Sequence, residues 1–113
     1  MMKEYVYVVH TRPLPGREDD FNKWYSDVHL ADVVALPGFV AAQRFRIADP
    51  SDPKSPERIY LSTYTMRTDD PQAALDHMHK LVASGEMYVT DAVEITDAVA
   101  HLYEVITPVV TEK

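Results

Sequence analysis

The chain has 113 residues, of which 46% are hydrophobic and 26% are charged, and its formal net charge is -7 at pH 7. This length fits one domain, residues 1–113, around a single hydrophobic core, and the composition excludes a disordered or fibrous chain. The 11 Lys and Arg residues are scattered, which excludes the basic surface that nucleic-acid binders and proteins of anionic membranes need. The absence of cysteine excludes thiol nucleophiles, thiolate metal sites and disulfides.

The first residues have no basic region followed by an apolar run, and no apolar stretch is long enough to cross a bilayer. We therefore expect neither a signal peptide nor a membrane span, and the cytoplasm is the expected location.

Two elements are predicted in the first third of the chain. Residues 4–11 alternate between β-branched and aromatic types, which predicts a strand. An acidic turn after Gly16 predicts the start of a helix over 17–35, which Pro37 and Gly38 end. On a helical wheel, the apolar stripe of this helix consists of Phe21, Trp24, Val28, Ala31 and Ala35.

Alternation resumes over 39–47 and 58–66 and predicts two strands. The proline-rich stretch 48–57 between them should be a long hairpin connection, and its part 49–56 is either a lid over a cavity mouth or a solvated turn.

A second helix should start after Asp69 or Asp70 as N-cap and end at Gly85. Its apolar stripe consists of Ala74, Leu75, Met78, Leu81 and Val82. Residues 86–97 are predicted to form a short helical turn followed by a loop that covers a cavity or a partner. Residues 98–106 complete the pattern as a strand.

The order β-α-β-β-α-β is that of the ferredoxin-like α+β fold, a four-stranded antiparallel sheet with two helices on one face. Every predicted strand has apolar or aromatic residues on both sides. The face without helices would then expose more apolar surface than a monomer tolerates, so we expect a homodimer through the sheet faces.

Tyr25, His29 and Asp32 follow one another at i, i+4 and i+7 along one edge of the first helix's apolar stripe. Asp32 falls close to the centre of that stripe, where a carboxylate needs a partner, and His29 is the nearest one. An Asp that orients a His is the arrangement of a general base. Burial and mutual attraction act in opposite directions on the pKa of His29, which we expect to lie near neutral pH.

In this hypothesis Tyr25 donates a hydrogen bond to a developing oxyanion, and aromatic residues stack on a flat substrate. The candidates for binding a small-molecule substrate are Tyr5, Tyr7, Trp24 and Tyr64, together with His10. His10 faces opposite to Tyr5 and Tyr7 and reaches either the cavity or the dimer interface.

The alternative to this catalytic hypothesis is structural: His29 and Asp32 cap each other or contact a dimer partner, and the aromatic residues pack the core.

His77 and His79 are two apart and point in different directions, so we expect surface positions and no shared metal. A metal site of His10, His29, Asp32 and His101 has no supporting motif, and we predict no metal and no cofactor. With only 3 glycines, no phosphate loop or dinucleotide fingerprint occurs.

The run F-x-x-W-Y-x-x-x-H-x-x-D-x-x-x-x-P-G, from Phe21 to Gly38, resembles the dimeric α/β-barrel superfamily and particularly its EthD-like branch. The resemblance implies a ferredoxin-like protomer, a homodimer and a ligand cavity between sheet and helices. It also implies His29 as general base, with Tyr25 and Asp32 as its supports. Members include polyketide cyclases, lactone isomerases, aldoxime and nitrile lyases, cofactor-free monooxygenases and haem-degrading enzymes.

The main functional prediction is a cofactor-independent enzyme that moves a proton on a small aromatic or carbonyl-bearing metabolite, as a lyase, dehydratase, cyclase or isomerase. The alternatives are a non-catalytic carrier or sensor, a plain dimerisation module with a filled core, and a cofactor-free monooxygenase. The chain departs from the haem-degrading branch because it has no clear axial-ligand signature. His77 and His79 fall where such a ligand would lie, but their spacing selects neither.

Overall fold

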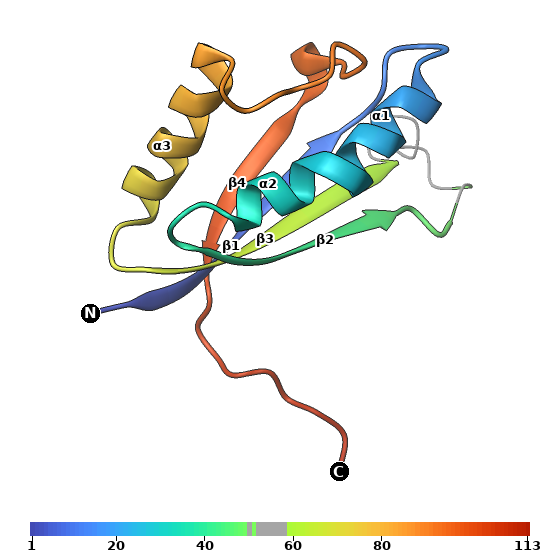
Figure 1. Ribbon diagram of the computed structural model, residues 1–113. Helices are drawn as coiled ribbons and strands as arrows, with labels where there is room; N and C mark the ends of the chain where they lie inside the picture. The colour runs from blue at the N-terminus through green and yellow to red at the C-terminus, as the bar shows by residue number, and fades with distance from the viewer. Residues whose placement is uncertain (50, 52–58) are drawn as a thin grey trace.

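A computed structural model of the chain describes residues 1–49, 51 and 59–113 (Figure 1). The strands are β1 (Lys3–Thr11), β2 (Phe39–Arg46), β3 (Tyr60–Thr68) and β4 (Val99–Glu104). The helical segments are α1 (Glu18–Trp24), η1 (Tyr25–His29), α2 (Leu30–Val34), α3 (Pro71–Ser84) and η2 (Ile95–Asp97). The predicted order of elements is confirmed, and strand ends differ from the prediction by one or two residues. Most of the predicted lid or turn at 49–56 lies outside the described residues.

The strands form one antiparallel sheet in the order β2-β3-β1-β4, which is the ferredoxin-like topology. β1 lies in the centre, where Tyr7 is opposite Tyr64 of β3 and Leu102 of β4. The helices all lie on one face of this sheet (Figure 1), as predicted. The core therefore lies between this face and the helices, with Phe21, Val33 and Met66 as its most deeply buried members.

The first helix differs from the prediction because one turn of it is a π-helix. In η1 the backbone N–H of Leu30 bonds to the carbonyl of Tyr25, five residues earlier, so the turn is wider than an α-helical turn. The wider turn rotates all later residues. Val28 is 39% exposed and Ala31 and Ala35 are also exposed, while Val33, outside the predicted stripe, is 0% exposed.

The second helix follows the prediction closely. The Asp70 side chain accepts a hydrogen bond of 3.0 Å from the N–H of Ala73, Pro71 lies in the first turn, and Gly85 ends α3 with a φ of +83°. Leu75 and Met78 are buried against the sheet, whereas Val82 is 36% exposed.

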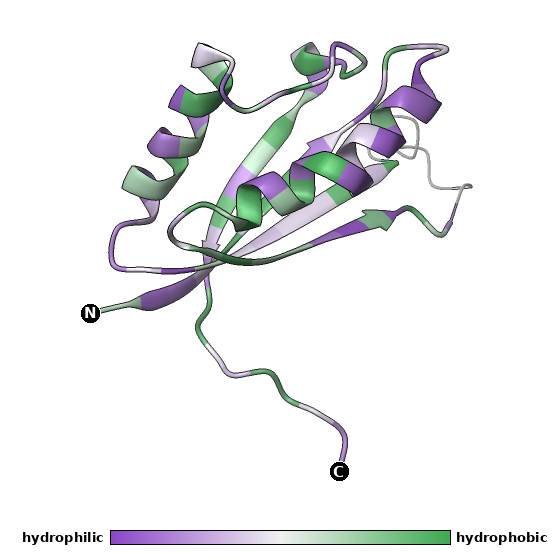
Figure 2. Ribbon diagram, in the orientation of Figure 1, coloured by the Kyte–Doolittle hydropathy of each residue, from purple (hydrophilic) through white to green (hydrophobic). Residues whose placement is uncertain are grey.

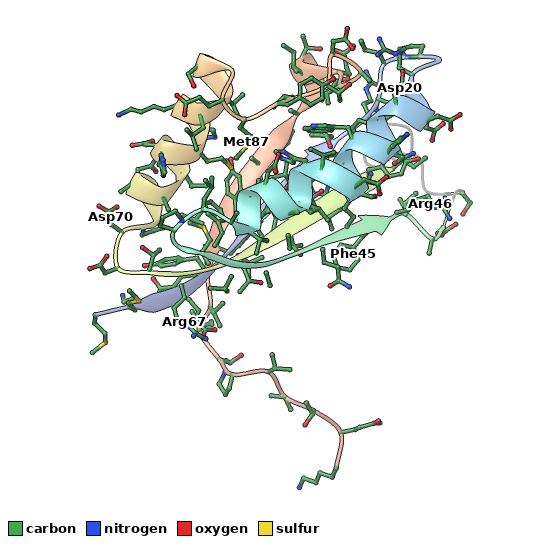
Figure 3. All side chains as sticks on the ribbon, viewed as in Figure 1. Asp20, Phe45, Arg46, Arg67, Asp70 and Met87 are labelled. Atoms are coloured by element: carbon green, nitrogen blue, oxygen red, sulfur yellow. The ribbon has the colours of Figure 1, made fainter. Side chains whose placement is uncertain are left out.

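Segment 86–97 has its helical turn at the end, in η2, and not at the start as predicted. It is fixed to the start of the first helix by the N–H of Leu14, which bonds to the carbonyl of Ala92 at 2.7 Å. Met87 and Ala92 are buried, and Figure 3 shows Met87 between α3 and β4. The prediction that this segment covers a cavity is confirmed below.

The face of the sheet without helices carries large apolar side chains. Phe45, Val99 and Tyr103 alternate with residues that face the helices, and they are 42%, 42% and 56% exposed. Beyond β4 the C-terminal residues extend away from the domain, and Figure 2 shows hydrophobic stretches along them. Of these, Ile106, Val109 and Val110 are 87% or more exposed. No helix in the described part of the chain is long and apolar enough to span a membrane.

Because of the π turn, we expect truncation of two valines to have different effects on the free energy of unfolding. Val33→Ala should lower the free energy of unfolding by about 2 kcal/mol, because two buried methyl groups are lost and a cavity remains. Val28→Ala should change it by less than about 0.5 kcal/mol, because Val28 already contacts water. Urea denaturation at one protein concentration measures both. Equal losses in the two variants would contradict the register that the π turn imposes.

Candidate active site

A cavity of about 240 Å³ lies between the first helix and α3, above β1, β3 and β4. Figure 3 shows side chains from both helices in the space above the sheet. The floor is formed by strand residues whose side chains face the helices: Tyr7, Val9, Thr11, Tyr64 and Ala100. The walls and roof come from the helices and from segment 86–98: Trp24, Tyr25, His29, Met78, His79, Val82, Val89, Val93 and Ala98. The lining is thus mainly apolar and aromatic, with a few polar groups.

His29 is a strongly perturbed polar group of the cavity. Its ring stacks on Trp24 at 4.5 Å between centroids and meets Tyr25 edge-on at 5.3 Å. Its Nδ1 atom is buried and has no hydrogen-bond partner among the described residues. Burial lowers the pKa of His29 to about 4, while the nearby charge of Asp32 opposes this shift. The prediction of a pKa near neutral pH is wrong, because desolvation outweighs the attraction.

Asp32 lies on α2 at a half-buried position and forms no hydrogen bond or ion pair with His29 in the described structure. The π turn explains this, because it turns Val33 toward the sheet and moves Asp32 to the side. Asp32 therefore acts on His29 only through its charge, at longer range than the predicted pair.

Two phenol groups lie beside His29. The hydroxyl of Tyr64 donates to the hydroxyl of Tyr25 at 3.4 Å, and the ring of Tyr64 lies 6.3 Å from that of Tyr7. Burial raises the pKa of Tyr64 and of Tyr7 above the ordinary value for tyrosine. Tyr7 and Tyr64 are therefore neutral at physiological pH. Tyr25 accepts the hydrogen bond of Tyr64 and keeps its own hydroxyl proton to donate to a ligand.

The remaining predicted substrate-binding residues occupy different places. The indole N–H of Trp24 donates to the carbonyl of Tyr88 at 3.0 Å, which joins the cavity wall to its roof. Tyr5 faces the helices and packs against the core but does not line the cavity. His10 follows Val9 in β1 and points to the open face of the sheet, away from the cavity.

The conceivable metal set is divided by the sheet, because His10 and His101 lie on the open face and His29 lies on the helical face. Within the described ranges, no three His, Asp or Glu side chains are grouped so as to hold a metal ion.

Two features of this region were missed from the sequence. His79, placed on the surface by the prediction, lines the cavity from α3 although it is exposed. Arg44 of β2 lies behind the cavity wall with its guanidinium over the ring of Tyr25. Strict alternation over 39–47 puts Phe39 and Arg44 on opposite faces of the sheet, but a register shift between Phe39 and Ala41 brings both to the helical face. The alternation therefore gave no signal for Arg44.

No family model matches the chain, and no curated protein matches it by sequence. Three solved structures resemble it over nearly their whole lengths. A "putative monooxygenase" from Shewanella loihica PV-4 is 16% identical, with a TM-score of 0.60, over 96% of this chain and 99% of its own. The haem degrader MhuD from Mycobacterium tuberculosis, solved with two haems in its active site, is 17% identical, with a TM-score of 0.65, over 93% and 98%. An ethyl tert-butyl ether D (EthD) family protein from Bacillus halodurans C-125 is 21% identical, with a TM-score of 0.54, over 94% and 100%.

These comparisons confirm the ferredoxin-like α+β fold, and an EthD family protein is among the structures that share it. They contradict the main functional prediction of a lyase, dehydratase, cyclase or isomerase. Two of the three proteins are described by oxidative or haem-degrading activities and none as a lyase or isomerase. The comparisons favour the alternative of a monooxygenase.

The lowered pKa of His29 predicts a loss of stability in acid. The unfolded chain binds a proton at His29 near the ordinary pKa of 6.5, and the folded chain binds it only near 4. Between these values the unfolded state holds more protons, so acidification through this window removes up to about 3 kcal/mol of stability. Urea denaturation between pH 7 and pH 4 should show a shallower loss for His29→Phe than for the parent chain. A matched control is His77→Phe at an exposed position of α3, which should keep the parent's slope.

Proposed function

We propose that this protein is a monooxygenase that acts on a small, flat molecule with an ionisable hydroxyl group, such as a phenol or an enol. The observation that carries the proposal is the neutral, half-buried imidazole of His29, whose Nδ1 has no hydrogen-bond partner among the described residues, beside the bonded hydroxyls of Tyr64 and Tyr25. A similar fold in a "putative monooxygenase" and in a haem degrader supports an oxidative reaction.

The residues of the cavity do not fit haem. A volume of about 240 Å³ is below the range of pockets that hold drug-sized ligands, and haem is larger than most of these. The lining also contains no Lys or Arg to meet the two carboxylates of haem. The cavity instead suits a ligand of one or two rings, held between Trp24 and the aromatic floor.

His29 supplies the proton-accepting step of the proposed reaction. In the free protein its pKa of about 4 makes it a weak base at neutral pH. A bound phenol changes this balance, because proton transfer to Nδ1 creates an imidazolium next to a phenolate, and their attraction in a dry site offsets the desolvation of both. The Tyr25 hydroxyl, which accepts from Tyr64, then donates a hydrogen bond to the phenolate oxygen.

The phenolate is the species that can react with oxygen, because the electron pair released by deprotonation raises the reducing power of the ring. In a reaction that converts a ring methylene group to a carbonyl, the substrate supplies four electrons. One atom of O₂ enters the substrate, and the other leaves as water with the two methylene hydrogens. The contribution of the protein is to bind the anion, align it and exclude water.

The proposal predicts oxygen uptake that depends on His29. A panel of hydroxynaphthalenes and of two-ring enolisable ketones such as 2-tetralone, followed with an oxygen electrode and mass spectrometry, should give at least one product that gains one oxygen atom from O₂. His29→Gln should lower kcat by about 100-fold or more, the usual contribution of a proton-transfer group. His77→Gln is the matched control and should keep the parent rate. Tight binding of these compounds with no oxygen uptake would contradict the proposal and favour a carrier or sensor.

We also propose that the open sheet face joins two copies of the chain. The exposed apolar side chains of Phe45, Val99 and Tyr103 lie on one continuous antiparallel surface, and the same surface on a second copy is the partner that matches it in shape and polarity.

Light scattering at micromolar concentration should give twice the mass of one chain. Phe45→Glu should shift the mass toward that of a monomer, because it places a charge in the interface. Ile95→Glu changes an apolar residue of η2 that is 74% exposed and lies away from the open face, and it should leave the mass unchanged. A monomeric mass for the parent chain would overturn this proposal.

A further inference from the structure

Arg44 of β2 lies in an aromatic cage outside the cavity. Its guanidinium carbon is 4.6 Å from the ring centroid of Tyr25, 5.2 Å from that of Tyr60 and 5.5 Å from that of Phe21. These distances are within the range of cation–π attraction. Arg44 is absent from the cavity lining and Tyr25 is present in it, so the ring of Tyr25 separates the cation from the ligand space.

The hydrogen bonds of Arg44 fix the cation in this cage. Nη1 donates to Ser26 Oγ at 2.7 Å, and Nη2 donates to Asn22 Oδ1 at 2.9 Å. Nε is buried and has no hydrogen-bond partner in the described structure. Because its terminal nitrogens are engaged by the first helix, Arg44 has little capacity to bind an external anion directly.

No carboxylate in the described part of the chain forms an ion pair with Arg44. Each described ion pair of the chain involves other residues, and the electrostatic neighbours of Arg44 are Tyr25, Tyr60 and Tyr64. Burial lowers the pKa of Arg44, but an arginine starts so high that it stays charged at neutral pH. A half-buried charge without a counter-ion costs free energy, so its field acts on the groups around it.

We propose that Arg44 is a positioning residue for the cavity: its charge acts through the ring of Tyr25 to make the hydroxyl of Tyr25, which accepts from Tyr64, a stronger hydrogen-bond donor. The cavity thereby prefers the anionic form of a hydroxyaromatic ligand. This inference rests on the proposed function and names the ionisation state that the site selects.

The physical basis is the response of a phenol to a nearby cation. A positive charge on the ring face withdraws electron density from the phenol oxygen, so the O–H bond is more polar and donates more strongly to an anion. The hydroxyl of Tyr25 accepts from the hydroxyl of Tyr64 at 3.4 Å, so the proton of Tyr25 is the one left to donate to a ligand. The effect is strong here because both rings are buried in an apolar site of low dielectric.

The other titratable groups around the pair are Tyr7 of β1, His29 of η1 and His79 of α3, with Asp32 of α2 acting on His29. Tyr7 is a neutral phenol, and His29 is neutral in the free protein because its pKa is about 4. Arg44 is therefore the fixed positive charge in contact with the ring of Tyr25.

The test compares an ionisable probe with a neutral one of nearly the same shape. Para-nitrophenol and para-nitroanisole are titrated against the parent chain and against Arg44→Met, at several pH values that span the ionisation of the phenol. The colour of para-nitrophenolate reports the pKa of the bound probe directly. In the parent chain this pKa should be lower than in water. Arg44→Met should weaken phenolate binding by about tenfold, which is about one pKa unit, and change para-nitroanisole binding by less than about twofold.

Two further variants separate charge from packing. Arg44→Lys keeps a cation in the cage and should restore part of the phenolate preference. Arg46→Met removes an arginine from the same strand that is exposed and outside the aromatic cage, and it should behave as the parent. Circular dichroism of each variant checks that the fold is retained.

Equal weakening of both probes in Arg44→Met would assign a structural role to Arg44 and overturn the inference. A parent chain that binds para-nitroanisole as well as the phenolate, or binds neither, would also overturn it. If the phenolate preference depends on Arg44 but no hydroxyaromatic supports oxygen uptake, the monooxygenase proposal fails and the role of Arg44 stands.

Discussion

The π-helical turn at Tyr25–His29 determines which side chains of the first helix face the sheet. Its hydrogen bond spans five residues, so side chains four residues apart come into line along the helix. Phe21, Tyr25, His29 and Val33 are spaced in this way, and they form the inner line of the helix. An uninterrupted α-helix would have turned Val28 and Asp32 toward the sheet instead. The cavity exists in its present form because this one turn places an imidazole, and not a valine, beside the two phenols.

Desolvation is the dominant electrostatic effect in the site. It lowers the pKa of His29 and of Arg44 and raises the pKa of Tyr7 and of Tyr64, so the pKa of each group differs from its value in water. Such a site gives a large response to any charge that enters it, because little solvent is present to screen the charge. A ligand that ionises inside the cavity therefore changes the protonation of the protein as well as its own.

The sequence predicted the fold well because the strands and the second helix obey simple rules of alternation and capping. As expected, α3 has Asp70 as its N-cap and ends at Gly85. The alternation of β1 correctly placed His10 and Tyr7 on opposite faces of the sheet. The sequence analysis placed Asp32 and Val28 wrongly on the inner side of the first helix, because a helical wheel of fixed period cannot contain a π turn. His79 is exposed as predicted, but its place in the cavity lining could not be foreseen because it depends on where α3 packs. His29 was identified, but its pKa was not, because the depth of burial follows from tertiary packing by Trp24 and Tyr64.

Trp24 is the one tryptophan of the chain, and it joins three parts of the site. Its ring stacks on His29, its edge meets Tyr25, and its N–H is bonded to Tyr88 in the segment that covers the cavity. The fluorescence of the whole protein thus comes from a single indole in the cavity wall. Ligand entry, protonation of the neighbouring imidazole and opening of the covering segment would each change the surroundings of that indole. The protein therefore carries its own optical reporter, and no label is needed to follow its cavity in solution.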